Sequence, residues 1–153
     1  MRRTMAMLLV LGVALAFGGQ TAWAGENFTA APLKGRSEVP AVDTQGTGVA
    51  TFKLRDEGLR FKVNVANLDD VIAAHIHCGA TGVNGPVAVT LFGGSVVTPH
   101  GTLAQGVITA PDAGNLCGFD DLDELVAAMQ SGDTYVNVHT LVNPGGEIRG
   151  QVK

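Results

Sequence analysis

Several common functional signatures are missing from this sequence of 153 residues. The glycine-rich stretch at residues 79–85 lacks the Gly-Lys-Ser/Thr ending of a phosphate-binding loop, and a turn accounts for it. There is no Gly-x-Ser-x-Gly nucleophile elbow. A blue-copper centre would need Cys, His and Met ligands on one late loop, and Cys117 has no such neighbours. These absences argue against P-loop nucleotide hydrolases, serine hydrolases and blue-copper electron carriers.

Long apolar runs are limited to the N-terminus. The chain begins with Met1-Arg2-Arg3, continues with an apolar run over residues 5–17 and then reaches Ala22-Trp23-Ala24. A basic start, a short apolar run and an A-x-A site predict a secretory signal peptide over residues 1–24. An uncleaved anchor is the alternative, but the run is short for a membrane span. We therefore expect an exported protein, periplasmic or extracellular, with no membrane span after cleavage.

Basic residues are scarce in the predicted mature chain. Residues 25–153 keep all 14 acidic residues but lose Arg2 and Arg3, which leaves 8 basic residues and a net charge of −6. Nucleic acids and anionic membranes bind basic patches, so neither is an expected partner. The length suits one domain with a single core. A protein partner and an oligomer both remain open.

Cysteine is also rare, with only Cys78 and Cys117 in the chain. An exported pair meets an oxidising compartment, which favours a disulfide. In the chain-entropy model, closing a loop of about 40 residues stabilises a fold by roughly 4 kcal/mol. The alternative is a metal-bound thiolate, but alternation along a strand would point Cys78 away from His75 and His77. We therefore predict a Cys78–Cys117 disulfide.

Most of the remaining chain alternates apolar and polar residues in short runs separated by Gly, Pro, Asn and Asp. This pattern predicts antiparallel strands with one buried face. The expected strands cover residues 28–34, 48–54, 59–65, 71–77, 87–92, 103–109, 134–140 and 147–152. One segment has helical spacing instead, with Asp121 and Gly132 suited to its ends, and predicts a helix over about residues 121–131. The predicted fold is all-β: a Greek-key β-sandwich or barrel of about eight antiparallel strands with one short helix.

Three histidines have the same parity as one another within their predicted strands. Alternation places Ile72, Ala74 and Ile76 on the core side of residues 71–77, and His75 and His77 on the opposite face. The same rule places His139 opposite the apolar residues of its own strand. If the strands are neighbours, these imidazoles form a polar patch on the outside of the sheet. Three imidazoles with a carboxylate are a ligand set for Cu(II) or Zn(II).

The same parity brings four further side chains to this face: Tyr135, Asn137, Glu147 and Arg149. If His75, His77 and His139 bind a metal, these four are expected to surround the ligands and orient the imidazoles. The alternative is a hydrogen-bonded polar network that ties the terminal strands down without metal. A simple ion pair is the plain interpretation of Glu147 and Arg149, which point the same way on one strand.

Five motifs carry a resemblance to a known family. They are Ser37-Glu38-Val39-Pro40, Ala73-Ala74-His75-Ile76-His77, Gly85-Pro86-Val87, Tyr135-Val136-Asn137-Val138-His139-Thr140 and Asn143-Pro144-Gly145-Gly146-Glu147-Ile148-Arg149-Gly150-Gln151. From about residue 28 to 153 the chain resembles the CHRD domain, a family named for chordin and common in exported bacterial proteins. The resemblance implies one extracellular or periplasmic β-sandwich domain over residues 25–153. Cys78 and Cys117 are not part of the family pattern.

A more limited likeness concerns the histidines. A His-x-His strand followed by a later Val-His is similar to the copper side of Cu,Zn superoxide dismutase, also a Greek-key barrel. No histidine clearly matches the one that bridges copper and zinc, and no zinc loop is recognisable. The resemblance therefore favours metal binding more than dismutase activity.

Three functional hypotheses follow. The first is an exported, non-enzymatic CHRD domain that binds copper, or zinc, through His75, His77 and His139. The second is a structural or protein-binding module in which the same residues form a network without metal. The third is a copper-dependent redox enzyme resembling superoxide dismutase, which needs an open coordination position.

Overall fold

The computed structural model describes residues 25–153, so the predicted signal peptide lies outside the described residues. The strands are β1 (Asn27–Lys34), β2 (Thr47–Arg55), β3 (Gly58–Ala66), β4 (Val71–Cys78), β5 (Val87–Phe92), β6 (Gly101–Ile108), β7 (Thr134–Thr140) and β8 (Ile148–Gln151). A 3₁₀ turn, η1 (Gly35–Ser37), follows β1, and the helix α1 (Leu122–Ser131) precedes β7.

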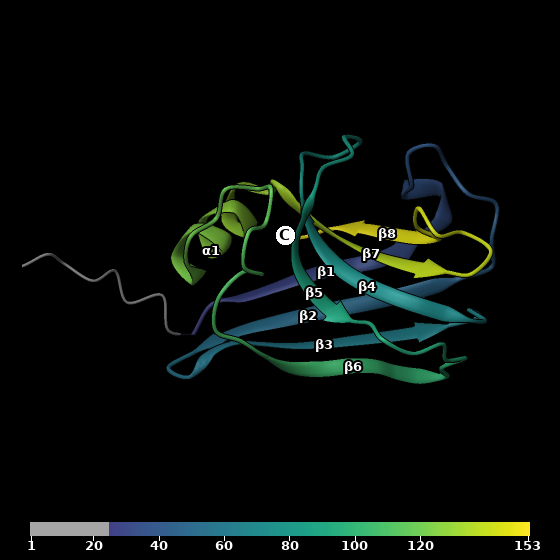
Figure 1. The fold of residues 1–153 in the computed structure, drawn as a ribbon, viewed down its shortest axis with the longest axis horizontal. Helices are drawn as coiled ribbons and strands as arrows, with labels where there is room; N and C mark the ends of the chain where they lie inside the picture. The colour runs from purple at the N-terminus through teal and green to yellow at the C-terminus, as the bar shows by residue number, and fades with distance from the viewer. Residues whose placement is uncertain (1–24) are drawn as a thin grey trace, which may run out of the picture.

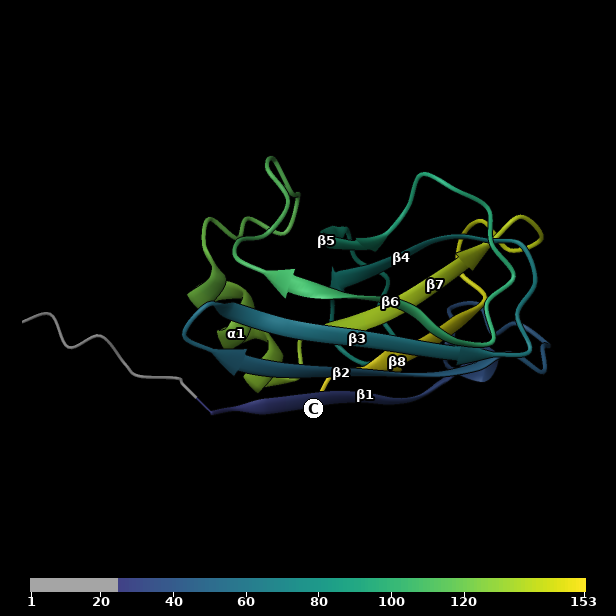
Figure 2. The same ribbon diagram turned by 90° about the horizontal axis from the view of Figure 1, so that it is seen from below.

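All eight strands form one antiparallel sheet in the order β5-β4-β7-β8-β1-β2-β3-β6. The sheet curls until its two edge strands, β5 and β6, lie near each other, although no ladder joins them (Figures 1 and 2). Several neighbours in the sheet are far apart in the sequence, such as β4 with β7 and β8 with β1. The predicted all-β barrel-like fold with about eight strands and one helix is confirmed.

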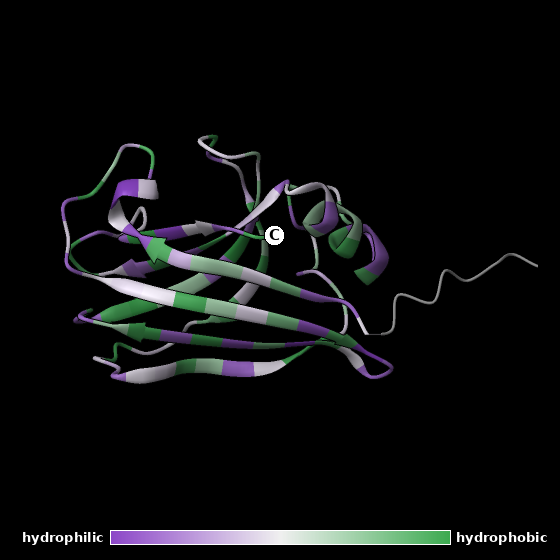
Figure 3. Ribbon diagram, turned by 180° about the vertical axis from the view of Figure 1, so that it is seen from behind, coloured by the Kyte–Doolittle hydropathy of each residue, from purple (hydrophilic) through white to green (hydrophobic). Residues whose placement is uncertain are grey.

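The core of the barrel follows the alternation of the β2–β3 hairpin. Ala50 and Phe52 of β2 are fully buried, as are Leu59 and Val63 of β3, and the two strands pair along their whole length. Figure 3 shows apolar residues alternating with polar ones along these strands. Because successive side chains face opposite sides, each strand places one apolar set in the interior.

The alternation expected for β4 is wrong at its start. Val71 is fully buried, whereas Ile72, expected in the core, is only partly buried. The cause is a register shift between Val71 and Ala73 in the ladder with β7, which puts one extra residue on β4. Beyond the shift Ala74 and Ile76 face the core as expected, so the parity of the two histidines is unaffected.

The helix α1 has the ends that the sequence predicts. The Asp121 side chain accepts a hydrogen bond from the backbone N–H of Glu124, and Gly132 ends the helix in the left-handed conformation at φ 75°. Its buried residues are Leu125, Val126 and Met129. These side chains belong to the barrel core, and the helix lies at one end of the barrel (Figure 1). Among residues 25–153 no helix has the length and apolar character that a bilayer crossing requires.

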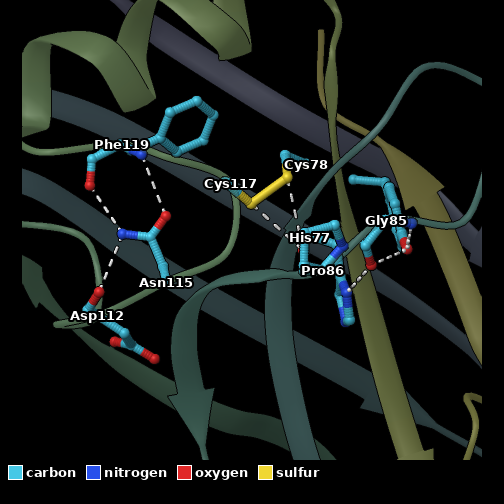
Figure 4. The surroundings of a disulfide bond; sticks show 9 residues. His77, Cys78, Gly85, Pro86, Asp112, Asn115, Cys117 and Phe119 are labelled. Atoms are coloured by element: carbon cyan, nitrogen blue, oxygen red, sulfur yellow. Dashed lines mark hydrogen bonds between the residues drawn. A yellow bond between two sulfur atoms is a disulfide. The ribbon is translucent and has the colours of Figure 1, made fainter.

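The predicted disulfide is present. Cys78, the last residue of β4, is bonded to Cys117 in the segment before α1, with the two Cα atoms 5.9 Å apart (Figure 4). Asn115 holds the same segment through bonds with the backbone of Asp112 and Phe119. The disulfide therefore fastens the irregular segment between β6 and α1 to the strand that carries His75 and His77.

Candidate metal centre

The histidines meet because β4 and β7 are neighbours in the sheet. In their ladder His75 lies opposite Asn137, and His77 lies opposite Tyr135. On the other side of β7, Asn137 lies opposite Arg149 of β8. The adjacency that the sequence could not decide is therefore present, and these side chains share the face directed away from the core.

This face is not the exposed surface that the sequence predicts. Every residue of β7 is buried, and Tyr135, Asn137, His139 and Arg149 are between 2% and 7% exposed. Three loops at residues 35–42, 79–86 and 141–147 contact it, with the hydrogen bonds given below. The expectation of an outer patch is wrong because alternation along a strand does not reveal what packs against its second face. His75, His77 and Glu147 remain partly exposed.

The three imidazoles form a compact group. Nδ1 of His75 lies 3.0 Å from Nε2 of His139. The ring centroids are 4.8 Å apart for His75 and His139, 5.6 Å for His75 and His77, and 5.9 Å for His77 and His139. One ring nitrogen from each histidine lies within 4.8 Å of the other two. The structure therefore brings together three histidines whose convergence the sequence left open.

Backbone carbonyls determine the tautomers of two rings. Nδ1 of His77 is 2.9 Å from the carbonyl oxygen of Gly85 (Figure 4), and Nδ1 of His139 is 3.0 Å from that of Pro144. A carbonyl can only accept, so in both rings Nδ1 carries the hydrogen and Nε2 presents a lone pair. Nε2 of His139 can accept from Nδ1–H of His75. Nε2 of His77 is buried and has no hydrogen-bond partner among the described residues.

Burial favours the neutral form of all three imidazoles. Burial, followed by the nearby His139 and His77 rings, lowers the pKa of His75 to about 4. Burial also lowers the pKa of His77 and of His139, although the carbonyl of Gly85 or Pro144 opposes the change in each case. The ring nitrogens therefore have lone pairs available near neutrality, and a metal ion would not have to displace protons.

The site has the features of a metal centre in outline. Metal-bound histidines usually donate their second ring N–H to a carbonyl or carboxylate, as His77 and His139 do here. Zn–N and Cu–N bonds near 2.0–2.1 Å put tetrahedral ligand nitrogens about 3.3 Å apart, between the 3.0 Å and 4.8 Å of this cluster. Small ring movements, with the hydrogen of His75 transferred from Nδ1 to Nε2, would therefore bring the three nitrogens to bonding distance.

Tyr135 contacts His77 directly, whereas the Asn137 side chain bonds to Glu38. The Tyr135 ring stacks on His77 with centroids 4.9 Å apart and an interplanar angle of 6°. Its hydroxyl donates to the Gly85 carbonyl, which also receives the His77 hydrogen bond. A Cβ at Gly85 would collide with the carbonyl of Cys78, so only glycine brings the backbone this close to both rings.

Glu147 and Arg149 do not form the predicted ion pair. Glu147 lies just before β8 and accepts hydrogen bonds from Thr44, Thr140 and Asn143. Burial opposes its ionisation, but these three donors outweigh burial and hold its pKa below the usual value. Neither side chain contacts a histidine through a hydrogen bond, so their expected role as direct supports of the imidazoles is not seen.

Arg149 belongs to a different set of contacts. Its guanidinium donates to the Asn84 side chain and to the carbonyls of Ala80 and Val83, and its central carbon lies 3.4 Å from the centroid of the Tyr135 ring. These bonds fasten the loop at residues 79–86 over β7 and β8. Arg149 thus reaches the histidines only through Tyr135 and this loop.

The sequence reasoning missed Glu38 as a site residue. The residue is 8% exposed, and both of its carboxyl oxygens lie 2.9 Å from Nδ2 of Asn137. Burial raises the pKa of Glu38 to about 7, against the opposing effects of Asn137 and Arg149. The only available signal was its place in the motif Ser37-Glu38-Val39-Pro40, because it lies in a loop 99 residues from its partner in the sequence.

Comparison with known proteins supports the resemblance seen in the motifs. The family model described as the CHRD domain matches residues 29–152. Chordin from Xenopus laevis is 30% identical over 140 residues, which cover 85% of this chain and 13% of chordin. The chain thus spans a small part of that relative. No solved structure matches the chain.

Proposed function

The chain belongs to the CHRD domain family, and from this premise we propose that it is an exported, non-enzymatic domain that binds one divalent metal ion. The ligands in this proposal are His75, His77 and His139. The observation that carries it is the buried Nε2 of His77, which lacks a partner within residues 25–153. A buried polar atom without a partner costs about 1–3 kcal/mol, and coordination would remove that cost.

Copper is the first choice of metal, with zinc second. Neutral imidazoles suit both ions, and Cu(II) binds a given nitrogen site more tightly than Zn(II). Three protein ligands would leave further positions open on either ion. The imidazoles of His77 and His139 are already oriented by the Gly85 and Pro144 carbonyls, so binding would require little ordering.

Export is supported by two observations. The disulfide suits an oxidising compartment, and the N-terminal 24 residues have the pattern of a signal peptide. This part is tested by identifying the N-terminal residue of the protein in two fractions. One is the periplasmic or culture fraction, and the other is the cytosolic fraction. A processed N-terminus at Gly25 is expected, and recovery of only unprocessed protein in the cytosol would overturn it.

The metal proposal is tested by titrating chelator-treated protein with Cu(II) and Zn(II), using calorimetry and electron paramagnetic resonance. Wild type is compared with His75→Ala/His139→Ala, and with His100→Ala as a matched control. His100 lies exposed in the loop before β6, away from the other histidines. One bound ion with nitrogen hyperfine coupling, lost in the double variant and kept in His100→Ala, is expected. Equal binding by all three proteins would refute the site.

A protein-binding module without metal is the second candidate. Exposed apolar side chains favour it, above all Leu141 and Val142, which are 57% and 83% exposed in the loop after β7. A dismutase-like redox enzyme is the remaining alternative. Assay of superoxide turnover by the copper-loaded protein separates it from a binding role.

A further inference from the structure

A groove of about 370 Å³ lies between the loops at residues 38–42 and 142–146. Its walls are largely aliphatic, formed by Val39, Pro40, Val42, Val142 and Pro144. Glu38 is the one charged residue among those that line it. The groove therefore combines a largely aliphatic lining with one carboxyl group and two amide side chains, those of Asn84 and Asn143.

The Glu38 carboxyl group has unused capacity for hydrogen bonds. Both oxygens share one donor group, the Nδ2 of Asn137, although an ionised carboxylate can accept about four bonds. The structure pairs no cation with it, since the ion pair found in residues 25–153 joins Glu57 and Arg60. Arg149 directs its hydrogen bonds to other acceptors. A buried carboxylate of this kind is stabilised by a cation that enters the groove.

The residues that line the groove favour a cation of a particular shape. Aliphatic walls suit a methylene chain, and the carboxyl group beyond them suits a compact positive head. Lysine has this form, whereas the planar guanidinium of arginine seeks two free oxygens side by side. The Asn137 amide already occupies both oxygens of Glu38 from one side.

Features around the groove fit a protein that carries such a side chain. Val39 and Val142, which line it, are 39% and 83% exposed, and the neighbouring Leu141 is 57% exposed. Apolar side chains around one buried charge are the usual centre and rim of a binding surface. Residues 25–153 carry a net charge of −6, which would attract a basic partner.

We propose that this groove is the docking site for a lysine side chain of a basic partner protein. The Glu38 carboxylate receives the ammonium group, and Val39, Val142 and Pro144 pack against the methylene chain. The site uses none of the three histidines, so it goes beyond the proposed metal function and can be tested on protein kept free of metal by a chelator.

The experiment titrates small probe molecules into the metal-free protein near pH 8 and monitors binding through the NMR signals of the valine methyl groups. The probes are N-acetyl-lysine-N-methylamide, the norleucine analogue, which lacks the charge, and the arginine analogue. Saturable shifts at Val39, Val42 and Val142 are expected from the lysine probe with Kd of about 1–10 mM, at least about fivefold tighter than from either analogue. Equal binding by norleucine, or no saturation by lysine, would overturn the proposal.

Two variants locate the interaction. Glu38→Gln is expected to weaken lysine binding about tenfold, whereas Glu57→Gln makes the same charge change at the β2–β3 turn and is expected to have no effect. Val142 is exposed, so Val142→Ser is not expected to destabilise the fold. The variant is expected to weaken lysine binding about twofold to threefold. Retention of full affinity by both Glu38→Gln and Val142→Ser would place the lysine elsewhere and refute the site. The histidine variants, by contrast, are expected to lose metal binding and keep lysine binding, so the two proposals are tested separately.

Discussion

Two groups of polar side chains share one face of β4, β7 and β8, and they differ in how completely the chain satisfies them. Glu147 accepts from three side chains, and Arg149 donates to three acceptors and covers the Tyr135 ring. In the second group, two buried atoms have no partner within residues 25–153, Nε2 of His77 and Oδ1 of Asn137, and Glu38 is held by one amide. Each group contains both buried and partly exposed side chains, so burial alone does not distinguish them.

The difference separates structural polar contacts from candidate binding sites. Glu147 and Arg149 join segments distant in sequence and fasten loops over the sheet, which accounts for them fully. A buried group that the chain leaves unsatisfied has a cost, and a ligand that supplies the missing partner removes it. This contrast directs the metal proposal to the histidines and the lysine proposal to Glu38, and substitutions at four residues test it.

The largest effect is expected at Arg149. Arg149→Met would leave the carbonyls of Ala80 and Val83 without their donor and is expected to destabilise the fold by about 3–4 kcal/mol. Urea unfolding measures it. Arg149→Lys keeps the positive charge but lacks the planar set of N–H donors of the guanidinium. It should therefore recover less than half of the stability lost in Arg149→Met. A loss below about 1 kcal/mol in Arg149→Met would mean that these bonds do not fasten the loop.

Glu147→Gln is expected to cost about 2 kcal/mol at pH 7, because an amide cannot accept all three bonds. The folded-state pKa of Glu147 lies below the unfolded value, so its stabilisation is present above the unfolded pKa and is lost as pH falls through the folded pKa. Unfolding curves at several pH values should therefore show wild type and variant converging in acid. A gap that stays constant down to low pH would contradict this account.

Glu38 should respond to pH in the opposite direction. Its pKa is raised to about 7 in the folded state, so folding stability falls as pH rises from about 4.5 to 7. Glu38→Gln keeps a neutral group and should be about 1–2 kcal/mol more stable than wild type at pH 8, with no advantage at pH 4. Arg149 is the charged group that opposes the shift. If the free energy of unfolding changes with pH in the same way for the two proteins, Glu38 ionises without a cost to folding stability.

The smallest effect is expected at His77 in metal-free protein. His77→Phe keeps the stack on Tyr135 and removes the unpartnered Nε2 together with one hydrogen bond to Gly85. We expect a change in unfolding free energy below about 1 kcal/mol. Added copper should then raise the melting temperature of wild type and not of the variant. A large loss of stability without metal would instead place His77 with the structural group.

Local patterns predicted much of this molecule correctly. The spacing of Leu125, Val126 and Met129, with Asp121 and Gly132 at the ends, predicted α1 almost to the residue. Alternation predicted the strands, and each predicted strand end lies within a few residues of the end in the structure. The exception at Ile72 arose from a register shift in β4, which has no local signal in the sequence.

The candidate site was predicted only in part. The shared parity of His75, His77 and His139 was visible, but their convergence depended on β4 pairing with β7 across more than 60 residues of chain. The loops that bury this face, the separate partners of Glu147 and Arg149, and the role of Glu38 were not visible. Each of them joins residues that are distant in sequence.

The sequence by itself determined the family, the strand and helix pattern, and which side chains share a strand face. These properties depend on backbone geometry that repeats every two or every 3.6 residues. Only the tertiary structure decided which strands are neighbours, which loops cover the second face and which polar atoms find no partner. Those outcomes depend on the packing of segments that no local pattern relates, and at this face they separate the satisfied Arg149 from the unsatisfied His77.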